Sequence, residues 1–120
     1  MQYIPIKTDI LHPPKDDLWS LFDRFLLDVQ EKDIVIVTSK IVSIGEGRCI
    51  QIGEESKESL VEREAEYTLT IEGRHPLTIA HHALISGAGI DESNGDGYYT
   101  LLPEDPYRSA KEIWEYLRTR

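Results

Sequence analysis

The chain has 120 residues, a formal net charge of −9 and 40% hydrophobic residues, which is enough for one compact domain with a core. The acidic balance, without clusters of lysine and arginine, argues against a duplex nucleic-acid binder, because phosphate contacts need concentrated positive charge. A single cysteine, Cys49, excludes an internal disulfide, and no apolar run approaches the roughly 20 residues of a membrane-spanning helix. We therefore expect a cytoplasmic protein that enters no membrane.

The first half of the chain predicts strands around one amphipathic helix. Residues 3–7 alternate as in a short strand, and residues 15–30 carry apolar side chains at helical spacing. Residues 34–37 form a continuous β-branched run, which is typical of a strand buried on both faces at the centre of a sheet. After a glycine-containing turn, residues 48–52 predict a further strand.

The second half predicts strands between two helices. Residues 56–65 favour a short, peripheral helix with Ser56 as its N-cap. Four strands follow, at residues 67–71, 77–79, 83–86 and 98–102. Asp105 and Pro106 are suited to begin a final helix, whose apolar face is expected to pack on the sheet. The whole chain, residues 1–120, thus predicts one α+β domain with a mixed sheet packed by an N-terminal and a C-terminal amphipathic helix.

Residues 86–97 combine glycines with hard-oxygen side chains in a turn that follows a predicted strand. Such a turn can hold a phosphate or a magnesium or manganese ion, with oxygen ligands from Asp91, Glu92 and Asp96. The alternative is a purely structural hairpin loop that turns at Asn94-Gly95, and composition alone favours this alternative. The segment fits neither the calcium-loop pattern nor the dinucleotide fingerprint, and the chain has no Walker-type phosphate loop.

A hydroxyl group and an ammonium group follow the predicted strand at residues 34–37. Ser39 and Lys40 stand near its carboxyl end, where open α/β sheets bind ligands, and together they are suited to a phosphate. A solvated lysine is the alternative, and by itself this pattern is weak.

The histidines and the cysteine indicate no catalytic centre. His81 and His82 are adjacent, and on a strand they would point to opposite faces, which is poor geometry for one metal ion. We expect both to be structural or exposed. Cys49 has no identifiable partner base and is expected to be a small packed residue.

Four motifs occur in order along the chain: DIVIVTSKIVS at residues 33–43, GEGR at 45–48, GAGIDESN at 87–94 and LPEDP at 102–106. Together they span most of the chain and resemble the coenzyme F420 gamma-glutamyl ligase family. The resemblance implies an α+β fold, an intertwined homodimer, and GTP- and magnesium- or manganese-dependent addition of L-glutamate to a deazaflavin precursor. The implied route phosphorylates a substrate carboxylate with GTP, after which the amine of glutamate attacks the acyl phosphate.

The resemblance also implies site residues. Ser39, Lys40 and Asn94 match nucleotide contacts of the family, and Asp91 matches a metal ligand. The loop at residues 9–12 falls where the family makes further nucleotide contacts, which adds Leu11 and His12 to the expected nucleotide site.

Two departures from the family pattern bear on activity. Ile44 stands where the family usually has a GTP-contacting lysine, and the carboxyl-terminal half of the family, with further metal ligands, is missing. We therefore expect a ligase domain that is incomplete alone. The alternatives are a non-catalytic binding or dimerisation module with the same fold, and an amide ligase that acts on another carboxylate acceptor.

Overall fold

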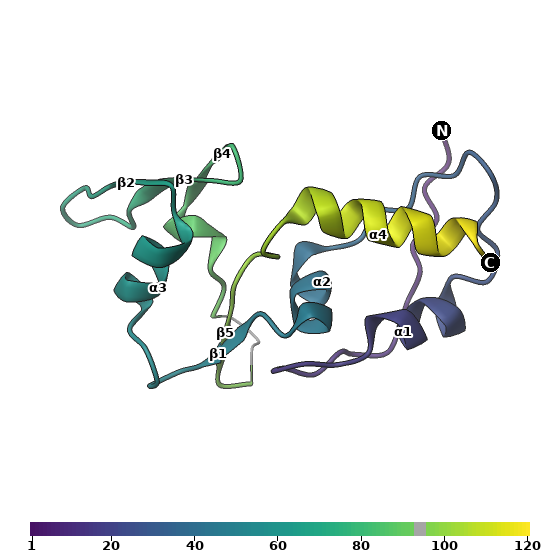
Figure 1. Cartoon of the computed structure of the whole chain (residues 1–120), viewed down its shortest axis with the longest axis horizontal. Helices are drawn as coiled ribbons and strands as arrows, with labels where there is room; N and C mark the ends of the chain where they lie inside the picture. The colour runs from purple at the N-terminus through teal and green to yellow at the C-terminus, as the bar shows by residue number, and fades with distance from the viewer. Residues whose placement is uncertain (93–95) are drawn as a thin grey trace.

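The computed structural model describes residues 1–92 and 96–120 and shows an elongated molecule of 48 × 27 × 23 Å with two hydrophobic clusters. One end of the molecule holds the helices α1 (Leu18–Phe25), α2 (Ser39–Glu46) and α4 (Pro106–Arg118) (Figure 1). A two-stranded ribbon of β1 (Cys49–Gln51) and β5 (Tyr98–Thr100) leads from these helices to the other end. That end holds α3 (Lys57–Glu64) and a three-stranded sheet. None of the described helices is long and apolar enough to cross a membrane.

The strands form two small antiparallel sheets. One pairs β1 with β5, and the other has the order β2 (Tyr67–Leu69), β3 (Leu77–Ala80) and β4 (Ala83–Ser86). The α+β class is confirmed, but the prediction of a single mixed sheet is wrong. The physical reason is connectivity, because a two-residue turn between β3 and β4 allows only antiparallel pairing.

The predicted helix caps are confirmed. The hydroxyl group of Ser56 accepts a 3.1 Å hydrogen bond from the Ser59 amide at the start of α3. The carboxylate of Asp105 accepts hydrogen bonds from the amides of Tyr107 and Arg108, each at 3.1 Å, with Pro106 as the first residue of α4. Each side chain thus satisfies amides that an α-helix leaves without an internal acceptor.

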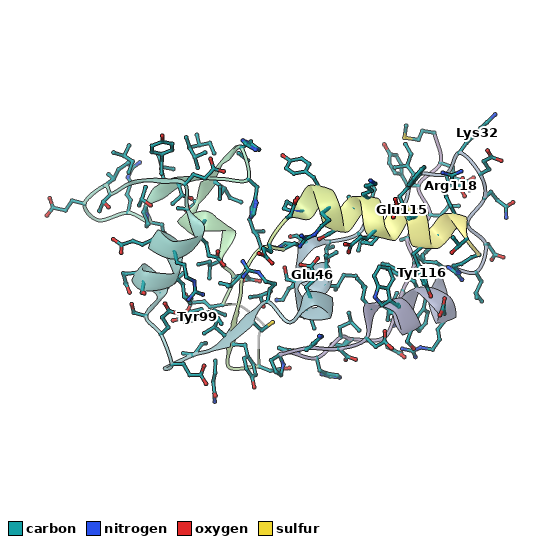
Figure 2. All side chains as sticks on the ribbon, in the orientation of Figure 1. Lys32, Glu46, Tyr99, Glu115, Tyr116 and Arg118 are labelled. Carbon is teal, nitrogen blue, oxygen red and sulfur yellow. The ribbon has the colours of Figure 1, made fainter. Side chains whose placement is uncertain are left out.

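The first hydrophobic cluster lies among α1, α2 and α4, so the prediction that the final helix packs on the sheet is wrong. Ile113 of α4 belongs to the same buried cluster as Leu21 and Phe22 of α1. Polar contacts reinforce this packing, because the Ser109 hydroxyl donates to the carboxylate of Glu46 on α2. Figure 2 shows Glu46 beneath α4 and Tyr116 extending from α4 toward α1.

Helix α1 is shorter than predicted. It begins at Leu18 and ends at Phe25, whereas the spacing of apolar residues predicted a helix over residues 15–30. Asp17 sets the start, because its carboxylate accepts a hydrogen bond from the Ser20 amide. Val29 lies outside the helix but still packs against the first cluster. The apolar residue at this position is therefore explained by burial and not by helical structure.

The second hydrophobic cluster lies at the sheet end of the molecule. Its buried members are Leu60, Val61, Ala88, Ile90 and Leu101. Helix α3 therefore contributes the narrow apolar face that its sequence predicted. This face packs against the turn that follows β4 and against Leu101, which follows β5.

Two predicted strands are absent. Residues 3–7 and 34–37 have no strand assignment, and the backbone of residues 34–37 makes no hydrogen bond with another described segment. The prediction that residues 34–37 are buried on both faces is wrong, because Ile34 is 81% and Ile36 84% exposed. Val35 and Val37 do pack against the first cluster. A β-branched run favours extended backbone, but a strand needs a neighbour to pair with.

Helix α2 was not predicted. Its residues include Ile41 and Val42, whose branched side chains lower helix propensity, and it directly follows an apparent strand. Gly47 ends it in the left-handed conformation, at φ 73°. His81 and His82 occupy the turn between β3 and β4, with φ values of 51° and 63°, and therefore lie outside the strands.

Candidate functional site

An ion pair joins two of the residues singled out from the sequence. Nζ of Lys40 lies 3.1 Å from Oδ2 of Asp91, and both side chains are partly exposed. The residues stand 51 positions apart, so only the fold brings them together. Lys40 belongs to α2 in the first cluster, whereas Asp91 follows the segment that packs in the second cluster.

Both backbone polar groups of Asp91, its amide and its carbonyl, are hydrogen bonded to the backbone of Thr100. Its amide donates to the Thr100 carbonyl at 3.0 Å, and the Thr100 amide donates to the Asp91 carbonyl at 2.7 Å. Just before it, the 3₁₀ turn η1 (Gly87–Gly89) is anchored by the buried hydroxyl group of Thr78, which accepts a 2.8 Å hydrogen bond from the Ala88 amide. These bonds fix the position from which the Asp91 carboxylate projects.

Ser39 and Lys40 are the first two residues of α2. The preceding residue, Thr38, has extended backbone and makes no side-chain capping bond. The amino end of a helix carries partial positive charge and unsatisfied amides, which attract anions such as phosphate. The ammonium group of Lys40 belongs to the same turn, and the Asp91 carboxylate offsets part of its positive charge. The arrangement is therefore chemically suited to a phosphate group close to a carboxylate.

The described residues offer too few ligands for a complete metal centre. Residues 1–92 and 96–120 contain no group of three histidine, cysteine or acidic side chains that could hold a metal ion. Glu92 lies next to Asp91, but its Oε1 is 3.1 Å from Nζ of Lys57, and Asp96 is exposed in the turn before β5. Magnesium takes about six oxygen ligands, so one carboxylate at Asp91 does not define a site for it.

The remaining predicted nucleotide contacts are placed differently. Leu11 is buried in the first cluster, and His12 is exposed with its amide donating 3.0 Å to Oδ2 of Asp16. This bond and a second one from the Asp17 amide lower the pKa of the Asp16 carboxyl group. Asn94 lies outside the described residues, as does the Asn94-Gly95 turn. The binding roles of Leu11, His12 and Asn94 stay predictions.

Ile44 and Cys49 both serve packing. Ile44 is only 3% exposed in the first cluster, so a lysine at this position would have to leave the core to reach a ligand. Burial raises the pKa of the Cys49 thiol, although a contact with the Thr100 hydroxyl and the charge of Lys40 oppose this. The reactive thiolate is thus disfavoured, as expected for a packed cysteine.

Two further ionic contacts were not singled out from the sequence. Lys57 pairs with Glu92, and Arg48 contacts Glu64 while its Nε donates to the Leu102 carbonyl at 3.0 Å. Lys57 opens a highly charged helix and resembles an ordinary solvated lysine, so nothing in its local sequence marked it. Arg48 is the last residue of the GEGR motif at residues 45–48, and this motif was the one feature of the sequence that could have drawn attention to it.

One hollow in the described part of the chain borders Ser39 without containing the ion pair. A groove of about 1000 Å³ runs between α4 and the segment at residues 29–39, and Ser39 lines it. Val35, Val37 and Trp114 line it together with polar and charged residues that include Asp33, Ser109 and Arg118.

The sequence model of the family described as F420-0:Gamma-glutamyl ligase matches residues 5–120. The chain is similar to the Coenzyme F420:L-glutamate ligase of Halorubrum lacusprofundi, with 34% identity over 83% of this chain and 49% of the relative. It is also similar to the ligase of the same name from Methanopyrus kandleri, with 30% identity over 95% of this chain and 52% of the relative.

The chain spans about half the length of these relatives. The family match nevertheless covers almost all of its 120 residues, including both members of the Lys40–Asp91 ion pair. On these grounds the chain belongs to the F420-0:gamma-glutamyl ligase family.

Proposed function

We propose that this chain is the GTP-binding part of a ligase that joins L-glutamate to a deazaflavin precursor through an amide bond, and that it is incomplete alone. The observation that carries the proposal is the Lys40–Asp91 ion pair at the amino end of α2. Both residues lie in the range that the family model matches, and the fold brings them within 3.1 Å of each other. Family membership and the half-length match support the ligase assignment and its incompleteness.

The proposed chemistry has two steps. A substrate carboxylate attacks the terminal phosphorus of GTP and releases GDP, giving an acyl phosphate; the amine of glutamate then displaces phosphate and loses a proton. Lys40 and the amino end of α2 would hold the phosphate groups and offset their negative charge. Asp91 would contribute one oxygen ligand to a magnesium or manganese ion whose other ligands come from outside the described residues.

Calorimetric titration of the purified chain with GTP in the presence of Mn²⁺ tests this proposal. We expect binding that requires the metal ion and weakens at least tenfold in both Lys40→Ala and Asp91→Asn. Lys57→Ala is the matched control, because it removes an ion pair of the same 3.1 Å length from the same loop and should leave binding unchanged. Equal binding by all variants, or none by the native chain, would contradict the proposal.

A non-catalytic binding or dimerisation module with the same fold is the second candidate. Two observations favour it: Ile44 is buried, and the described residues hold no group of three acidic, histidine or cysteine side chains that could bind a metal ion. A folded chain that shows no GTP binding by calorimetry at millimolar GTP and Mn²⁺ would establish this candidate over the first.

A further inference from the structure

We propose that Asp91 acts as an internal competitor for phosphate at Lys40, so that the chain without a ligand keeps its own anion site occupied. The inference rests on the proposed function of this site and concerns its regulation. A ligand that carries phosphate binds by displacing the Asp91 carboxylate from the Lys40 ammonium group. The ion pair is thus an autoinhibitory contact, which a phosphate contact replaces when a ligand arrives.

The carboxylate of Asp91 lies where it opposes a phosphate at the same lysine. Its Oδ2 is 3.1 Å from Nζ of Lys40. A phosphate oxygen bound by a lysine is likewise a negatively charged acceptor at hydrogen-bonding distance. Two anions next to one ammonium group repel each other, so the carboxylate and a phosphate weaken each other's binding.

The two partners of the ion pair differ in how firmly they are held. Asp91 exchanges two backbone hydrogen bonds, of 3.0 and 2.7 Å, with Thr100, which is buried. Lys40 reaches the carboxylate from the first turn of α2 through a long, flexible side chain. The ammonium group is therefore the partner that can move, and a ligand can take it without a shift of α2.

The ion pair is weak enough for a ligand to displace. The side chains of Lys40 and Asp91 are 33% and 40% exposed, and ion pairs with such access to water are weakened by solvent screening. A triphosphate carries several negative charges and attracts the ammonium group more strongly than one carboxylate does. Asp91 belongs to the same chain, however, which keeps its carboxylate at a high effective concentration near Lys40. We therefore expect a modest penalty on anion binding and not a block.

A neighbouring ion pair separates this competition from a general effect of charge. The net charge of −9 repels anions, so the loss of any carboxylate favours anion binding slightly. Glu92 directly follows Asp91, and its Oε1 lies 3.1 Å from Nζ of Lys57. Glu92→Gln therefore changes the net charge by the same amount as Asp91→Asn but leaves the Lys40–Asp91 ion pair in place.

Calorimetric titration with inorganic triphosphate in metal-free buffer containing EDTA tests the proposal. We expect Asp91→Asn to bind triphosphate about fivefold more tightly than the native chain, because a partly exposed ion pair no longer competes. Glu92→Gln should stay within about twofold of the native chain. When Lys40→Ala is also present, Asp91→Asn should give no gain, because the competition acts through Lys40. Circular dichroism of each variant checks folding.

The native chain provides a second measurement that needs no substitution. The NMR signal of the Asp91 side-chain carboxyl carbon should shift when the native chain is saturated with triphosphate, because the carboxylate loses its ammonium partner. This signal reports the exchange of partners directly.

Three outcomes would overturn the proposal: equal triphosphate affinity in the native chain and Asp91→Asn, an equal gain in Glu92→Gln, or an Asp91 signal that triphosphate leaves unchanged. The proposed function fails separately, because it predicts that Asp91→Asn weakens GTP binding in the presence of Mn²⁺. A gain of triphosphate affinity without metal, combined with no Mn²⁺-dependent binding of GTP by the native chain, would support the competitor role of Asp91 and contradict the proposed function.

Discussion

The hydroxyl group of Tyr116 on α4 donates a 2.6 Å hydrogen bond to Oδ1 of Asp23 on α1. Nε of Arg120 lies 3.6 Å from the same oxygen atom. The hydrogen bond, with smaller contributions from desolvation and from the charge of Asp23, raises the pKa of Tyr116 above its ordinary value of 10.0. The two helices are thereby joined by a contact whose strength depends on pH.

The Tyr116 contact predicts a loss of stability at alkaline pH. The folded state holds the phenolic proton more tightly than the unfolded state, so the contribution is complete below about pH 10 and disappears as pH rises through the higher folded-state pKa. We expect Tyr116→Phe to lower the free energy of unfolding at pH 8 and to approach the native chain above pH 10. Urea unfolding of both proteins from pH 8 to 11 measures this, and a constant difference would contradict it.

Gly89 is predicted to be intolerant of a side chain. Its φ is 71°, and an added Cβ would lie 2.7 Å from Cδ1 of Leu102. We expect Gly89→Ala to reduce the free energy of unfolding by about 2–3 kcal/mol, because backbone strain and overpacking add. Gly87→Ala is the control, since Gly87 has a similar φ of 55° with open space around it and should lose only about 1 kcal/mol. Equal losses in urea unfolding would rule out the contact with Leu102.

Arg48 is predicted to stabilise the chain more than an ordinary surface arginine. Its guanidinium group contacts Glu64 and the Leu102 carbonyl, and its side chain is largely shielded from solvent. We expect Arg48→Ala to cost about 2–3 kcal/mol, because a shielded carboxylate and a carbonyl lose their donor. Arg63→Ala, which breaks the more exposed contact with Glu55, should cost at most about 1 kcal/mol. Chemical denaturation of the two variants would contradict this if their losses were the same.

Local signals in the sequence predicted the elements that depend on local chemistry. Asp105 with Pro106 and Ser56 were expected to begin helices, and both do, because capping needs only neighbouring backbone amides. The hairpin between β3 and β4 and the ribbon strands were likewise expected near their observed positions. The caps and the β3–β4 hairpin are each specified within a short stretch of chain, whereas the pairing of β1 with β5 joins residues far apart in the sequence.

Elements that depend on distant partners were predicted poorly. Residues 34–37 have the composition of a central strand, yet nothing in the described chain pairs with them, and Ile34 and Ile36 face solvent. The same apparent strand hid the start of α2 at Ser39, where β-branched residues also lower helix propensity. Propensity describes which backbone angles a segment prefers, whereas pairing depends on segments that the local sequence does not contain.

The candidate site shows the same division. Lys40 and Asp91 were singled out separately, each from a local pattern and a family motif, and no spacing rule placed them in contact. Their meeting depends on the β1–β5 ribbon and on the hydrogen bonds between Asp91 and Thr100. The burial of Ile44 could not be predicted either, because it follows from α2, a helix that the sequence did not reveal.

The β1–β5 ribbon has a mechanical consequence. It is three residue pairs long and connects the helical end of the molecule to the sheet end (Figure 1). The Lys40–Asp91 ion pair crosses beside it, with Lys40 attached to the helical end and Asp91 to the sheet end. The ion pair therefore ties the two ends together beside the ribbon, and a ligand that separates Lys40 from Asp91 would remove one of the contacts between them.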